Sequence, residues 1–180
     1  VHRALVHSCN VFFYQVGRAA GIDAIARYAD MLNIGRPTGI DLPGEGAGVL
    51  PSPEWKMRTR GEPWYAGETI SVSIGQGILA VTPIQMAVLM SAVATGKKPK
   101  PHLVRPENGS GPEPTPLPIS AGTLAIVRAA LKDVVEEGTG RRASLGSIAV
   151  AGKTGTAQVF KKSAGIDADA LPKPERDHAW

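Results

Sequence analysis

A chain of 180 residues with 43% hydrophobic content can bury the core of one globular domain, which excludes a disordered tail. The formal net charge is only +4, and the nine aromatic residues (three each of Trp, Tyr and Phe) form no stripe with the basic residues, which argues against nucleic-acid binding. The sequence holds no run of about 18 apolar residues, so we expect no membrane span in it. Its single cysteine excludes an internal disulfide framework.

Glycine and proline divide the first half of the chain. Residues 1–20 predict a segment leading into Ser8-Cys9-Asn10, followed by a helix that ends at Gly21. Residues 23–33 predict a second helix that ends at Gly35. We assign both helices to a helical lobe. Residues 35–63 are rich in Gly and Pro, which predicts a loop with at most a short helix over Glu54–Arg58.

Two further helices are predicted by their caps. Thr82 precedes Pro83 and is followed three positions later by Gln85, which is typical of a capping box with proline at the first helical position. The apolar run Met86–Met90 makes that helix central. Ser120 is expected to cap a helix reaching about Glu137, whose apolar stripe is core: Leu124, Val127, Leu131, Val134 and Val135.

The segment between these two helices is a predicted surface excursion. Residues 99–118 contain seven prolines, too many for a regular element unless a short edge hairpin interrupts it. The basic stretch Lys97–Lys100 is interpreted as a solvated loop.

A Lys-Thr-Gly motif follows the last predicted helix, which ends at Gly138-Thr139-Gly140. Strand periodicity over residues 148–156 places Thr154 and Thr156 on one face, side by side, and Lys153 with Gly155 on the other. An ammonium directed into the protein body needs polar partners. Helices followed by this strand predict an α+β domain, an antiparallel sheet flanked by helices with a helical lobe.

Ser8-Cys9-Asn10 is the second motif. Taken alone, Ser or Asn before an apolar helix is explained by N-capping. Together, Ser-x-Asn and Lys-Thr-Gly in this order are typical of serine acyl-transfer enzymes that also carry Ser-x-x-Lys. No serine of the chain is followed by lysine three positions later, so we expect a piece of a longer protein, truncated at both ends.

The chain resembles the later part of the transpeptidase domain of class B penicillin-binding proteins over nearly all of its length, and is most similar to their penicillin-binding protein 2 group. The run Phe12–Gln15 favours that group over the division-specific penicillin-binding protein 3 group. The segments that carry the resemblance are Ser8–Val16, Thr38–Pro43, Trp64–Thr69, Ser73–Gly77, Thr82–Ala87 and Lys153–Val159.

The resemblance implies that residues 1–180 form the C-terminal part of a single, incomplete transpeptidase domain with the fold shared by penicillin-binding proteins and serine β-lactamases. It implies a serine-type D-Ala-D-Ala transpeptidase or carboxypeptidase that cross-links peptidoglycan stem peptides during cell-wall elongation. β-Lactams would acylate the same serine. Without that nucleophile, we expect the isolated chain to be inactive. The alternatives are a β-lactamase and a non-catalytic β-lactam sensor.

The resemblance also implies roles for individual residues. Ser8 would relay a proton to the leaving amine, Asn10 would orient the missing lysine and the substrate, and Lys153 would keep a positive charge beside Ser8. Thr154 and Thr156 would bind the substrate carboxylate, with the Thr156 N–H as half of an oxyanion hole.

Gly155 is grouped with the substrate-binding residues, because glycine in a strand suggests that something approaches the backbone closely.

Cys9 has two interpretations. A free cysteine beside a helix start is usually a small buried residue. The resemblance implies instead a structural zinc ligand whose Asp and His partners lie upstream, with His2 and His7 less suited. Catalysis itself would require no cofactor.

The resemblance finally implies partners and a location. The partners would be D-Ala-D-Ala stem peptides, β-lactams and a membrane glycosyltransferase of the elongation complex, with no nucleic acid. The location would be a periplasmic domain of a protein anchored in the inner membrane.

Overall fold

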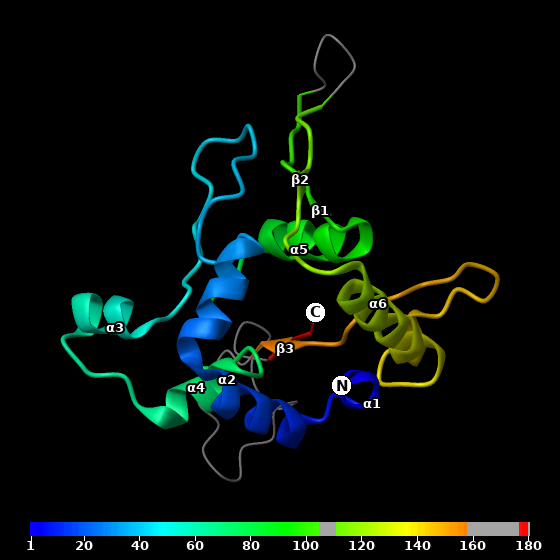
Figure 1. The fold of residues 1–180 in the computed structure, drawn as a ribbon. Coiled ribbons are helices and arrows are strands. Elements are labelled where there is room, and N and C mark those ends of the chain that lie inside the picture. Colours follow the sequence, from blue (N-terminus) through cyan, green and yellow to red (C-terminus); the bar gives the residue numbers. More distant parts are fainter. Residues whose placement is uncertain (105–110, 158–176, 180) are drawn as a thin grey trace. The chain divides into compact units, whose positions relative to one another are not determined.

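The computed structural model describes residues 1–104, 111–157 and 177–179. It forms two compact units, Val1–Asn10 with Ala130–Trp180, and Val11–Ala129, which we call the first and second unit. The elements are α1 (His2–Val6), α2 (Asn10–Met31), α3 (Pro53–Arg60), α4 (Ala66–Val72), α5 (Pro83–Thr95), β1 (Lys97–Lys98), β2 (Thr115–Pro116), α6 (Ala121–Glu136), the 3-10 helix η1 (Arg141–Ala143), β3 (Thr156–Ala157) and β4 (His178–Ala179) (Figure 1).

The helix break predicted at Gly21 is present in α2. Gly21 has φ 78° and ψ 164°, so α2 is two helical segments joined at a kink that a residue with a Cβ would strain. Gly17, one turn before the kink, is buried against Ser73. A Cβ at Gly17 would approach the Ser73 Cβ to 2.3 Å, so this contact between the helix and residue 73 requires glycine.

The predicted capping box starts α5. The Gln85 N–H donates to Thr82 Oγ1 at 3.3 Å, and Gln85 Oε1 accepts from the Thr82 N–H at 2.9 Å. The same side chain is 0% exposed, and its amide donates to the carbonyls of Arg36 and Ala47, each at 2.8 Å. Gln85 therefore ties the loop after α2 to the start of α5.

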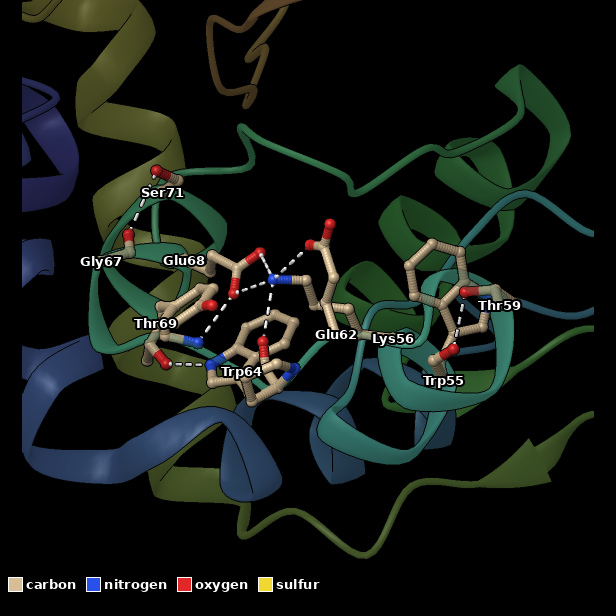
Figure 2. A network of polar contacts seen from close by, with 11 residues as sticks. Trp55, Lys56, Thr59, Glu62, Trp64, Gly67, Glu68, Thr69 and Ser71 are labelled. Carbon is tan, nitrogen blue, oxygen red and sulfur yellow. Dashed lines mark hydrogen bonds and ion pairs between the residues drawn. The ribbon is translucent and has the colours of Figure 1, made fainter.

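A buried lysine organises α3 and the segment leading to α4 (Figure 2). The Lys56 side chain is 3% exposed, and its ammonium reaches the Pro63 carbonyl and the Glu68 carboxylate, both at 2.9 Å, and Glu62 at 3.4 Å. Glu68 also accepts the Tyr65 N–H at 2.8 Å. Part of the Trp64–Thr69 motif thus holds the start of α4, a helix that the sequence did not predict.

Two short strands form a hairpin around the proline-rich stretch: β1 lies just before residue 99, and β2 lies within residues 99–118. β1 and β2 are antiparallel, with Lys97 opposite Pro116 and Lys98 opposite Thr115. Lys97 and Lys98 are therefore strand residues, which corrects the prediction of a solvated loop there. The Lys98 ammonium lies 3.4 Å from Asn33 Oδ1, which gives this basic residue a partner that a sequence cannot reveal.

The first unit packs α1 against the last turns of α6. Val6 of α1 is buried, as are Leu131, Val134 and Val135 of the predicted apolar stripe. His2 Nε2 contacts Asp133 Oδ2 at 2.7 Å. The Gly152 N–H donates to the Leu131 carbonyl at 3.0 Å, which fixes the chain to α6 one residue before Lys153.

The predicted strand over residues 148–156 is wrong in extent. β3 begins only at Thr156, where it pairs antiparallel with β4, Thr156 opposite Ala179. Ile148 makes one isolated bridge with Leu145. Strand alternation needs a paired, pleated backbone, and residues 149–155 have none in the described part of the chain. Gln158 and Val159 lie outside the described residues.

Candidate active site

Ser8 stands at the turn between α1 and α2. Its φ is 50°, a left-handed conformation that costs a non-glycine residue about 1–3 kcal/mol and is concentrated at functional sites. The Ser8 and Cys9 N–H groups donate to the carbonyls of Leu5 and Ala4 at 3.2 and 2.9 Å. The Ser8 hydroxyl forms hydrogen bonds with Lys153 and Thr139, both of which lie outside α2. Its hydrogen bonds therefore differ from those of a residue that caps the N-terminus of α2.

Lys153 has an acceptor for each of its three ammonium protons. They are Ser8 Oγ, the Thr154 carbonyl oxygen at 3.0 Å and Thr154 Oγ1 at 3.3 Å. Burial lowers the pKa of Lys153 below its ordinary value. The expected polar partners are present, but Lys153 and Thr154 converge instead of pointing to opposite faces, because residues 153–155 are not in a pleated strand.

A third hydroxyl completes a cluster that we call the hydroxyl cluster: Ser8, Thr139 and Thr154. Thr139 Oγ1 lies 3.3 Å from Ser8 Oγ and 2.9 Å from Thr154 Oγ1. Sequence reasoning treated Thr139 only as part of a helix end and missed it. The available signal was its position between two glycines immediately after an amphipathic helix.

Close packing requires glycine at position 138 and leaves little room for a side chain at position 140. A Cβ at Gly138 would lie 2.4 Å from the Val6 carbonyl oxygen, and one at Gly140 would lie 3.0 Å from Val134 Cγ1. The Thr139 N–H also donates to the Val6 carbonyl at 3.3 Å. These contacts bring the turn after α6 against the end of α1 and place Thr139 beside Ser8.

The remaining predicted site residues are exposed. Asn10 is the first residue of α2, and Thr154, Gly155 and Thr156 lie in the segment that leads into β3. The structure therefore joins Ser8, Lys153 and Thr154 directly. It leaves the substrate contacts predicted for Asn10, Gly155 and Thr156 as predictions.

The residues present do not complete a zinc site around Cys9. Cys9 is an exposed free thiol, and the described ranges hold no group of three or more His, Cys, Asp and Glu side chains that suits a metal. A structural zinc takes four ligands. A zinc role for Cys9 thus depends on ligands outside the described residues and stays a prediction.

A comparison with protein families identifies the family to which the chain belongs. The model of the penicillin-binding protein transpeptidase domain matches residues 1–172. The chain belongs to this family. Peptidoglycan D,D-transpeptidase MrdA of Acinetobacter baumannii is 39% identical over 189 residues, which cover 99% of this chain and 28% of that protein. MrdA of Escherichia coli K12 is 35% identical, over 99% of this chain and 30% of its own length. The chain thus spans less than a third of these relatives.

Solved structures confirm the predicted α+β fold and the similarity to the penicillin-binding protein 2 group. Penicillin-binding protein 2 of Helicobacter pylori, in a complex with MreC, aligns with a TM-score of 0.86 and 30% identity over 99% of this chain and 32% of its own. Penicillin-binding protein 2 of Pseudomonas aeruginosa aligns with a TM-score of 0.80 and 33% identity over 88% of this chain and 38% of its own. Among the described residues, none of the helices combines the length and the hydropathy that a membrane-spanning segment needs.

Proposed function

We propose that this chain is part of a full-length peptidoglycan D,D-transpeptidase that cross-links stem peptides through a serine acyl-enzyme and is acylated by β-lactams. The observation that carries the proposal is the hydrogen bond from Lys153 to Ser8, one of the three members of the hydroxyl cluster. It joins the Ser-x-Asn and Lys-Thr-Gly motifs across 145 positions of sequence. The names of the MrdA relatives support the same reaction.

In this proposal, the nucleophilic serine comes from a segment preceding Val1 and attacks the carbonyl between two D-alanines. As the C–N bond breaks, Ser8 gives its hydroxyl proton to the leaving nitrogen and takes one from the Lys153 ammonium. The hydroxyl proton of the attacking serine passes to the lysine of its own Ser-x-x-Lys motif. The amine of a neighbouring stem peptide then attacks the acyl-enzyme and returns a proton through Ser8 to Lys153, and the serine leaves as its hydroxyl by taking its proton back from that lysine. Lys153 is suited to this exchange because burial lowers its pKa, which makes its proton easier to give.

Residues around the relay would hold the substrate. Thr154 and Thr156 would donate hydroxyl hydrogen bonds to its terminal carboxylate, and the Thr156 N–H would stabilise the oxyanion. Asn10 would orient the substrate peptide from the start of α2. Gly155 would allow the substrate backbone to approach closely.

We further propose a periplasmic domain in a membrane-anchored protein and protein partners in an elongation complex, including a membrane glycosyltransferase. The support is similarity: a penicillin-binding protein 2 is known in a complex with MreC, and another similar chain belongs to a peptidoglycan synthase complex that couples polymerization and crosslinking. D,D-carboxypeptidase activity, in which water replaces the acceptor amine, is the minor reaction expected of the same acyl-enzyme.

The test is time-resolved intact mass of the full-length protein mixed with benzylpenicillin. One stable adduct, absent when the isolated 180-residue chain is used, is the expected result. An adduct that disappears while the drug is hydrolysed would instead establish a β-lactamase. Absence of any adduct would overturn the proposal.

A further inference from the structure

We propose that Thr139 is a positioning residue that couples the carboxylate-binding hydroxyl of Thr154 to the proton relay at Ser8. The inference rests on the proposed function and deepens it. It starts from the two contacts of one hydroxyl, because Thr139 Oγ1 is within hydrogen-bond distance of both Ser8 Oγ and Thr154 Oγ1.

The hydroxyl cluster has too few protons for all of its members to donate outward at once. Lys153 only donates, so it supplies protons to Ser8 Oγ and Thr154 Oγ1 and takes none. The three hydroxyls have one proton each, and the two contacts inside the hydroxyl cluster use two of them. One proton is left to point out of the cluster. Ser8 and Thr154 therefore cannot both donate outward while both contacts with Thr139 persist.

Substrate binding would select one arrangement. A carboxylate that accepts the Thr154 proton leaves Thr154 Oγ1 as an acceptor, so Thr139 donates to Thr154 and Ser8 donates to Thr139. When Ser8 later releases its proton to the leaving nitrogen, Thr139 can rotate its hydroxyl and donate to the Ser8 oxygen while the proton from Lys153 is being transferred to that oxygen. Binding of a carboxylate at Thr154 thereby changes the hydrogen bonds of Ser8 through rotation of the Thr139 hydroxyl alone.

The geometry is suited to this rotation. The contact of Thr139 with Thr154 is the shorter, at 2.9 Å, and that with Ser8 is the longer, at 3.3 Å. The backbone of Thr139 is fixed by its bond to Val6 and by the crowded glycines on either side, while its side chain is exposed. An exposed hydroxyl that water can satisfy adds little to folding stability, so the fixed placement beside Ser8 points to chemistry.

The experiment measures the acylation rate of the full-length protein by benzylpenicillin and by its methyl ester, which lacks the carboxylate charge. Thr139→Val keeps the shape and removes the hydroxyl, Thr139→Ser keeps the hydroxyl, and Thr59→Val is the matched control on α3, where the hydroxyl bonds the Trp55 carbonyl. Thermal melting of each variant shows whether it is folded.

We expect Thr139→Val to slow acylation by benzylpenicillin by about tenfold, the size of one lost hydrogen bond, with about twofold slowing for the ester. Thr139→Ser restores most of the rate, and Thr59→Val leaves it unchanged. Equal slowing for both compounds, or a normal rate in folded Thr139→Val, overturns the coupling. If Thr139→Val does not fold, failure of Thr139→Ser to match the wild-type ratio of the two rates overturns it instead. An unmodified wild-type protein would contradict the proposed function itself, so the two failures are distinguishable.

Discussion

The ammonium of Lys153 donates a hydrogen bond to the hydroxyl oxygen of Ser8, 145 positions earlier in the chain. Two features of the first unit make the contact. The Gly152 N–H holds the backbone before Lys153 against Leu131 of α6, and the turn after α6 is bonded to Val6 just before Ser8. The packing of α6 on α1 thus brings the two motifs together.

Replacing Lys153 with alanine should slow β-lactam acylation of the full-length protein by more than about tenfold, because the proton relay loses its charge and its donor. Stopped-flow acylation of the purified variant measures the effect. Unchanged acylation would remove Lys153 from the relay.

The pH dependence of the acylation rate should reveal the titration of Lys153. Burial lowers the pKa of Lys153 below 10.5, and the relay needs the charged form. Activity is therefore present below the folded pKa and falls as the pH rises through it, so the midpoint of the alkaline limb should lie below 10.5. A limb centred at or above 10.5 in the wild-type protein would conflict with a partly buried lysine.

Gly138→Ala should damage the site through packing, since its Cβ would be 2.4 Å from the Val6 carbonyl oxygen. Relieving the clash costs about 1–3 kcal/mol and displaces Thr139, so both stability and acylation rate should fall. Gly122→Ala on α6 is the matched control, because its Cβ would meet only Ser120 Oγ, at 4.0 Å. An alanine at position 138 with native stability and rate would show that the turn has room to move.

Sequence patterns predicted most of the helices and the two motifs, because caps and apolar spacing act locally. The breaks at Gly21 and the capping box at Thr82 are examples. What the sequence could not give depends on distant partners. β3 extends only over the residues that pair with β4, a strand more than twenty positions away whose pairing local patterns do not reveal. Thr139 enters the site only through the packing of α6 on α1. The start of α4 likewise depends on Lys56, twelve positions before Glu68.

Glu68→Gln should loosen the start of α4, because Glu68 accepts hydrogen bonds from the buried Lys56 ammonium and the Tyr65 N–H. Hydrogen–deuterium exchange of peptides covering residues 64–72 should then be faster. Glu62→Gln is the control, since Glu62 is largely exposed and 3.4 Å from Lys56. Equal protection in the two variants would show that the Lys56 network does not hold this helix.

Acid should have the same local effect as that substitution. Burial raises the pKa of Glu68, but the hydrogen bonds from Lys56 and Tyr65 outweigh it and leave the pKa below 4.5. The stabilising contribution of a carboxylate with a lowered pKa is present above its unfolded value and is lost as the pH falls through the folded value. The protection factors of residues 64–72, which correct the exchange rates for the slower intrinsic exchange in acid, should therefore fall below pH 4.5 in the wild-type protein and change less in Glu68→Gln.

The most direct test is a transpeptidation assay of the full-length protein with a D-Ala-D-Ala stem peptide and an amine acceptor, followed by mass spectrometry. The wild-type protein should form the cross-linked product and release D-alanine, while Ser8→Ala should lose both by at least about a hundredfold. A Ser8→Ala variant that cross-links at the wild-type rate would contradict the assignment of Ser8 and Lys153 as the proton relay.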